Sequence, residues 1–126
     1  MNNLLKDKNI FFLIIGILVL GALITAIVKA SINASSKKYD DFAQCLASKK
    51  LTMYGTSWCS HCNAEKALFG KSFQYVPYVE CSESPDVCLK NKIEGYPTWI
   101  TENGEKYIGE LTLEKLSQIS DCELPS

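Results

Sequence analysis

The sequence predicts an α/β fold, with a mixed four-stranded sheet flanked by helices, behind one N-terminal transmembrane helix. Three observations support this prediction. Residues 10–28 carry no charged side chain, residues 40–126 alternate between helical and strand patterns, and Asn103-Gly104 separates two short strand-like segments. A long uncharged run is typical of a membrane span, and Asn-Gly is a strong hairpin signal.

The N-terminal part divides into a polar tail at 1–9, the apolar run at 10–28 and a small, polar linker at 29–39. About 20 apolar residues in a helix cross a hydrocarbon layer of about 30 Å. A cleaved signal peptide is the alternative, because Val28-Lys29-Ala30 offers small residues for cleavage. Signal peptides usually have apolar regions of about 7–15 residues, so we expect a retained anchor. Lysines flank both ends of the run, so charge does not predict its orientation.

The expected domain at 40–126 has an element order that predicts a mixed sheet. A strand–helix–strand unit implies two parallel strands, and the hairpin adds antiparallel strands, with helices on both faces of the sheet. Pro77 interrupts the second strand and predicts an edge position for it. The expected helices cover 40–50, 59–69, 86–93 and a segment capped by Thr112, and the expected strands cover 51–54, 73–79, 98–101 and 105–108. The side chains of the 59–69 helix expected to face the core are Cys62, Ala64, Ala67 and Leu68.

The cysteine content predicts an oxidising compartment. An even number of cysteines in a small domain beside a membrane-targeting segment suits a periplasmic, extracellular or lumenal location. The net charge of −1, with both signs mixed throughout, gives no indication of nucleic-acid binding. The six cysteines are Cys45, Cys59, Cys62, Cys81, Cys88 and Cys122.

Cys59 and Cys62 are the candidate catalytic residues, because their spacing places two thiols one helical turn apart at the expected start of a helix. Only a thiolate attacks a disulfide, and the unpaired N–H groups and partial positive charge of a helix N-terminus favour the thiolate. We therefore expect Cys59 to be the nucleophile and Cys62 to be the resolving thiol. The cysteines themselves carry the electrons, so no separable cofactor and no metal are implied.

Four neighbouring residues are candidates for supporting this chemistry. A protonated His61 can stabilise the Cys59 thiolate, although it can also be a solvated side chain. Trp58 shields the edge of the site or simply packs there. Pro97 can form a cis peptide bond that presents the Tyr96 backbone to an extended substrate, or an ordinary trans turn.

The remaining cysteines are expected to form structural disulfides. Six residues separate Cys81 from Cys88, which suits a loop disulfide, and Cys45 and Cys122 lie in the first and last helices of the domain. Six cysteines allow fifteen pairings, so both assignments are hypotheses. A second redox pair formed by Cys81 and Cys88 is an alternative. A zinc site formed by these two cysteines together with Cys59 and Cys62 is less favoured, because Cys81 and Cys88 are spaced too widely for a normal zinc knuckle.

The segments Trp58-Cys59-Ser60-His61-Cys62 and Gly95-Tyr96-Pro97-Thr98 resemble those of the thioredoxin family. Together with Met53-Tyr54-Gly55 and the segment at 77–81, they are similar to the thioredoxin-like domain found fused to, or beside, bacterial vitamin K epoxide reductase homologues. This resemblance implies a relay from substrate proteins through the domain to a membrane quinone reductase of that type, here a separate chain.

The sequence departs from typical thioredoxins at two places. Met53 occupies the position where thioredoxins usually carry a buried acid, and Ser60-His61 replaces the Gly-Pro of reducing thioredoxins. Both departures argue against a general cytosolic reductant. We therefore expect a membrane-anchored thiol–disulfide oxidoreductase that acts on extracytoplasmic proteins. The alternative is a non-catalytic binding module in which the Cys59–Cys62 disulfide is structural.

Overall fold

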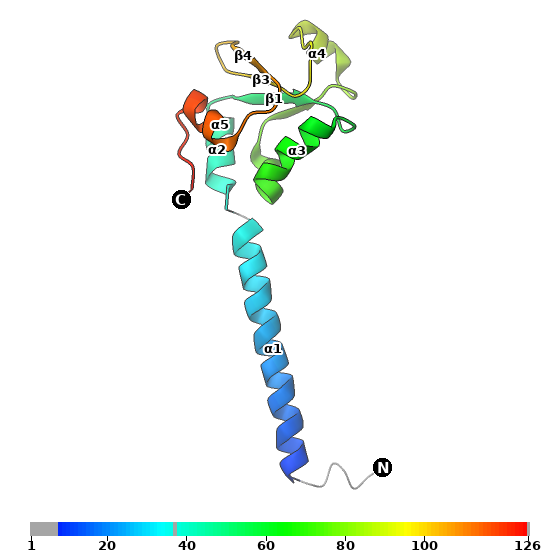
Figure 1. Ribbon diagram of the computed structural model, residues 1–126, viewed down its shortest axis with the longest axis vertical. Helices are drawn as coiled ribbons and strands as arrows, with labels where there is room; N and C mark the ends of the chain where they lie inside the picture. Colours follow the sequence, from blue (N-terminus) through cyan, green and yellow to red (C-terminus); the bar gives the residue numbers. More distant parts are fainter. Residues whose placement is uncertain (1–7, 37, 126) are drawn as a thin grey trace. The chain divides into compact units, whose positions relative to one another are not determined.

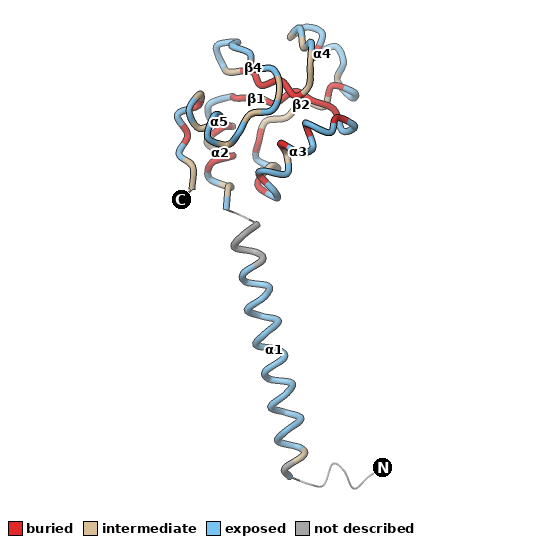
Figure 2. The backbone as a smooth tube through the Cα atoms, viewed as in Figure 1, coloured by how far each residue is buried: buried red, intermediate tan, exposed pale blue. Residues whose placement is uncertain are grey.

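The computed structural model describes residues 8–36 and 38–125 of the 126-residue chain. The chain divides into two compact units, at 1–35 and 36–126. The first contains one long helix, α1 (Lys8–Ser36), whose described side chains are mostly exposed (Figures 1 and 2). Its segment Ile10–Ser31 is long and apolar enough to cross a membrane, a property that N-terminal signal sequences share.

Helix α1 extends beyond the predicted span and includes most of the segment expected to be a linker. The expected linker began at residue 29, but helical structure continues to Ser36. Residues 29–36 contain neither glycine nor proline, so nothing in them interrupts the backbone hydrogen bonding of the helix. The hydroxyl of Ser31 also donates to the Ile27 carbonyl over 3.0 Å, which keeps this polar side chain satisfied within the helix.

The globular unit contains a mixed four-stranded sheet, as the sequence predicts. Its strand order is β2-β1-β3-β4. Strand β1 (Thr52–Gly55) pairs in parallel with β2 (Tyr78–Glu80) and antiparallel with β3 (Thr98–Ile100). Strand β3 forms the expected hairpin with β4 (Lys106–Ile108). The position of β2 at the edge of the sheet confirms the prediction made from Pro77.

One face of the sheet carries the larger part of the core. Helices α2 (Asp40–Ser48), α3 (Ser60–Phe69) and α5 (Leu113–Ser120) pack there against Met53 and Trp99 (Figure 1). Met53 and Trp99 are directly opposite each other on neighbouring antiparallel strands, and neither is exposed to solvent. This shared core fixes the position of the first turn of α3, where the paired cysteines lie.

The opposite face of the sheet is covered by α4 (Pro85–Lys90). Tyr54 and Ile100 point to this side and form a second core cluster with Cys81 and Cys88. The sheet therefore has helices on both faces, as predicted.

Two local predictions were wrong. The segment expected to be a strand from residue 73 forms a 3-10 helix, η2 (Gly70–Tyr75), and strand structure begins only after Pro77. Gly70 adopts a φ of +55°, which ends α3 and redirects the chain into this tight turn. The buried face of α3 also differs from the predicted one, because Ala64, Ala67 and Leu68 are exposed. The buried positions are Cys62, Glu65 and Phe69.

Candidate active site

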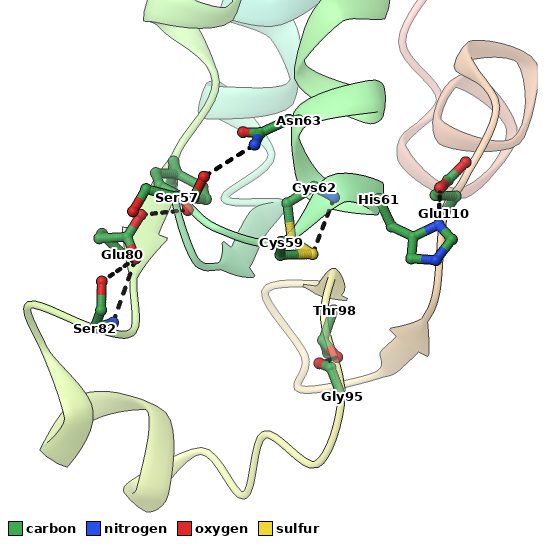
Figure 3. The surroundings of a disulfide bond; sticks show 11 residues. Ser57, Cys59, His61, Cys62, Asn63, Glu80, Ser82, Gly95, Thr98 and Glu110 are labelled. Atoms are coloured by element: carbon green, nitrogen blue, oxygen red, sulfur yellow. Dashed lines mark hydrogen bonds and ion pairs between the residues drawn. A yellow bond between two sulfur atoms is a disulfide. The ribbon is translucent and has the colours of Figure 1, made fainter.

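The Cys59–Cys62 pair lies at the N-terminus of α3, where Cys59 is the N-cap residue (Figure 3). The two residues form a disulfide with their Cα atoms 5.3 Å apart. The backbone N–H of Cys62 donates to Sγ of Cys59 over 3.1 Å. A sulfur thus takes the place of the side-chain oxygen that usually caps a helix, and it lies where the helix dipole favours negative charge.

The two sulfur-bearing residues differ in accessibility. Cys59 is 8% exposed, whereas Cys62 is fully buried beneath it. Gly55, at the end of β1, makes room for Cys62, because a Cβ atom at Gly55 would lie only 2.8 Å from Sγ of Cys62. An attacking group from another protein therefore reaches Cys59 and not Cys62. The role of Gly55 in the site depends on a close approach that the sequence does not reveal.

The turn at 95–98 lies beside the disulfide (Figure 3). The peptide bond between Tyr96 and Pro97 is cis, and Pro97 is buried. The carbonyl of Pro97 accepts a hydrogen bond from the Gly109 N–H at 2.8 Å. The exposed ring of Trp58 packs edge-on against Tyr96, with the ring centroids 6.0 Å apart, and so connects the segment before α3 to this turn.

His61 is exposed, and its hydrogen bond is to Glu110 rather than to either sulfur. Its Nδ1 atom pairs with Oε1 of Glu110, on the segment between β4 and α5 (Figure 3). The printed contact of the His61 ring is therefore with Glu110, and neither Cys59 nor Cys62 takes part in it. Glu110 was not identified from the sequence, because nothing in the local pattern indicates a pairing with a residue 49 positions away.

A buried carboxyl group, Glu65, lies one turn beyond Cys62 on α3. Its Oε1 atom accepts two hydrogen bonds, from Nε1 of Trp99 at 2.8 Å and from the Leu111 N–H at 2.9 Å. Burial raises the pKa of Glu65 to about 7, with a smaller contribution from the nearby charge of Glu110, although the two hydrogen bonds act in the opposite direction. Glu65 was not identified from the sequence, because an acidic residue in a helix is usually on the solvent face.

The other four cysteines form two disulfides in the pairs expected from the sequence. Cys45 on α2 is joined to Cys122 after α5, and Cys81 to Cys88 on α4, each with Cα atoms 5.8 Å apart. Neither of these two disulfides has a sulfur at the N-cap of a helix. Cys81 and Cys88 bond to each other and not to Cys59 or Cys62.

Comparison with known proteins identifies the family. The thioredoxin family model matches residues 31–121. This chain belongs to the thioredoxin family. It is 35% identical over 108 residues to the thiol-disulfide oxidoreductase LTO1 of Arabidopsis thaliana, an alignment covering 76% of the chain and 28% of the plant protein. It is also 30% identical over 86 residues to protein disulfide isomerase-like 2-2 of Oryza sativa subsp. japonica, covering 58% of the chain and 23% of that protein.

The thioredoxin-family relatives agree with the predicted fold and with the predicted class of enzyme. They are named for thiol–disulfide oxidation or disulfide isomerisation, which are reactions of paired cysteines. The chain spans only about a quarter of the length of these curated relatives.

Proposed function

We propose that this chain is a membrane-anchored thiol–disulfide oxidoreductase that exchanges disulfides with extracytoplasmic proteins. The observation that carries the proposal is the position of Sγ of Cys59, which accepts a backbone N–H at the start of α3 while Cys62 lies buried behind it. The family membership and the names of the relatives support the same class of reaction.

The proposed reaction begins at Cys59, because it is the more accessible sulfur of the pair. In the oxidised state, a client thiolate attacks Sγ of Cys59, and Cys62 leaves as a thiolate. A second client thiol then resolves the mixed disulfide, so that the client gains a disulfide and the Cys59–Cys62 pair gains two electrons. In the opposite direction, the Cys59 thiolate attacks a client disulfide and Cys62 resolves the intermediate. No separable cofactor is needed.

The turn at 95–98 is the proposed docking edge for the client chain. The cis Tyr96–Pro97 bond lies beside the disulfide, and Trp58 borders the same site. An extended client segment can pair with the Tyr96 backbone while its cysteine reaches Cys59. The disulfides Cys45–Cys122 and Cys81–Cys88 are proposed to be structural.

We also place the electron acceptor in the membrane. The apolar segment Ile10–Ser31 is proposed to be a retained anchor, with the globular domain on the extracytoplasmic side. The resemblance of the active-site motifs favours a membrane quinone reductase of the vitamin K epoxide reductase type as the partner.

Full-length protein in liposomes with such a reductase and a quinone should regain its Cys59–Cys62 disulfide after mild reduction. Omission of the quinone should prevent this reoxidation, and a quinone-independent rate would contradict the partner assignment.

A trapping experiment tests the exchange reaction itself. In a Cys62→Ala variant the mixed disulfide cannot be resolved, so client proteins should accumulate on Cys59 as adducts sensitive to reductant. A Cys59→Ala/Cys62→Ala variant is the matched control and should capture none. If no adduct forms and the Cys59–Cys62 couple has a reduction potential far below that of the glutathione pool, the pair is structural and the domain is a binding module.

A further inference from the structure

The full burial of Cys62 raises a question that the exchange reaction leaves open. A thiol must lose its proton before it attacks, and burial in apolar surroundings favours the return of a proton to a thiolate that has left a disulfide. Cys62 has no exposed surface through which solvent could make this exchange directly. A buried group that can hold a proton near Cys62 would meet this need in both directions of the reaction.

Glu65 is such a group, and its placement is unusual for a carboxyl side chain. It is 1% exposed, and it lies three residues after Cys62 on the same buried face of α3. Side chains three residues apart on a helix have their Cβ atoms about 5–6 Å apart. Glu65 thus lies one turn from the resolving cysteine on its own helix, and its carboxyl group is bonded to Trp99 on β3 and Leu111 before α5.

The two oxygen atoms of Glu65 have different environments. Oε1 accepts both hydrogen bonds, which fixes the side chain between β3 and the segment before α5. Oε2 is buried and makes no hydrogen bond to any residue that the structure describes. A purely structural acceptor would need only the first oxygen, and leaving the second buried without a partner is costly.

We propose that Glu65 takes the proton that Cys62 loses before it attacks and returns it when Cys62 is released. This role rests on the thiol–disulfide activity proposed above. When the protein reduces a client, the proton of the Cys62 thiol passes to the Glu65 carboxylate, and the Cys62 thiolate attacks Sγ of Cys59. The bond between Cys59 and the client sulfur breaks, the client leaves as a thiolate, and the proton on Glu65 passes to that thiolate or to solvent.

The electrostatic surroundings of Glu65 suit this role. Its pKa of about 7 allows the carboxyl group to gain and lose a proton near neutral pH. The charged group that acts on it is Glu110, on the segment before α5, and Glu110 is itself paired with His61. Cys62 lies one helical turn earlier on the same buried face of α3. From the sheet, Glu65 is faced by the Trp99 indole, which does not titrate. Trp99 lies directly across from Met53, and both belong to the core cluster that also contains Cys59 and Cys62.

The test uses Glu65→Gln, because the amide oxygen can still accept from Trp99 and Leu111. The full-length protein, reduced only at Cys59 and Cys62, is mixed with Ellman's reagent, and the released thionitrobenzoate is followed by absorbance. The first release reports attack by Cys59, and the second reports resolution by Cys62. General acid–base groups typically contribute about 10²–10⁴-fold, so we expect the second step to slow at least about tenfold at pH 7.5. Its inflection near pH 7 should also be lost, while the first step changes less than about twofold.

The experiment distinguishes a failure of the proposed Glu65 role from a failure of the proposed exchange activity. Glu83→Gln, at an exposed acidic residue, should leave both steps unchanged. A second step that is unchanged in Glu65→Gln, or both steps slowed equally, would overturn the role of Glu65. A wild-type first step no faster than that of free cysteine would instead count against the proposed function.

A second measurement does not depend on exchange. In a Cys59→Ala background, the ¹³Cβ shift of Cys62 is followed with pH. Ionisation of Glu65 should add an inflection to this curve, and Glu65→Gln should remove it. Identical curves with and without Glu65 would refute the proposal.

Discussion

The disulfides Cys59–Cys62 and Cys45–Cys122 have the same chemistry in two different environments. Their Cα separations are similar, at 5.3 and 5.8 Å, and both include a buried sulfur-bearing residue. The Cys59–Cys62 disulfide closes a loop within one helical turn, and Sγ of Cys59 accepts a hydrogen bond from a helix N–H. The Cys45–Cys122 disulfide joins two residues that are 77 positions apart, one on α2 and one after α5. The comparison indicates that the helix N–H groups beside a sulfur, and not burial alone, separate the pair proposed to be reactive from the pair proposed to be structural.

The largest expected effect comes from removing the reactive sulfur. Cys59→Ala should lower disulfide exchange to the background rate, a loss of at least about 10³-fold, because no other accessible sulfur lies at a helix N-cap among the described residues. The measurement is the rate of reduction of a model protein disulfide. Retention of a tenth of the wild-type rate would show that another cysteine can replace Cys59.

Removal of the other disulfide should affect stability and not exchange. The chain-entropy relation for a loop of this size predicts that Cys45→Ala/Cys122→Ala lowers the free energy of unfolding by about 4.5 kcal/mol. Denaturant unfolding of the full-length protein measures the loss. Exchange at Cys59 should remain within about twofold of wild type under conditions where the domain is folded. A strong loss of exchange in the folded variant would break the distinction between the two pairs.

Glu65 should make the stability of the domain depend on pH. Its pKa is about 7 in the folded protein and near 4.5 when exposed, so the folded state binds more protons between these values. Stability from this group therefore falls as pH rises from about 4.5 to 7, by up to about 3 kcal/mol. The difference in unfolding free energy between wild type and Glu65→Gln, measured across this range, isolates the effect. A difference that does not vary with pH would contradict the assignment.

The smallest expected effect concerns the charge beside the reactive pair. His61→Gln removes a side chain that can carry positive charge at the start of α3, where such interactions contribute up to about 1 kcal/mol. The rate of Cys59 alkylation should fall by up to about fivefold. Glu110→Gln removes the carboxylate that pairs with His61 and should raise the rate of Cys59 alkylation.

The sequence predicted the features of the fold and site that depend on local pattern. The Asn103-Gly104 hairpin, the Thr112 cap and the edge strand after Pro77 all follow from residues adjacent in the chain. Glu65 and Glu110 could not be predicted, because their partners are 34 to 49 residues away and come together only when the sheet and helices pack.

The error on α3 has a related physical cause. Apolar patterning assigned Leu68 to the core, yet the helix is rotated so that a carboxyl group is inside and Leu68 is outside. Hydrogen bonds to Trp99 and Leu111 offset the cost of burying Glu65. A sequence pattern that treats every acidic residue as exposed cannot anticipate this compensation.

The bond between Cys45 and Cys122 turns most of the globular domain into a closed covalent ring. A protease that cuts the backbone once anywhere within this ring therefore releases no fragment. The two pieces would migrate together on a non-reducing gel, still attached to α1, and would separate only after reduction. A nicked domain would thus stay attached to α1 as a single covalent unit until its disulfides were reduced.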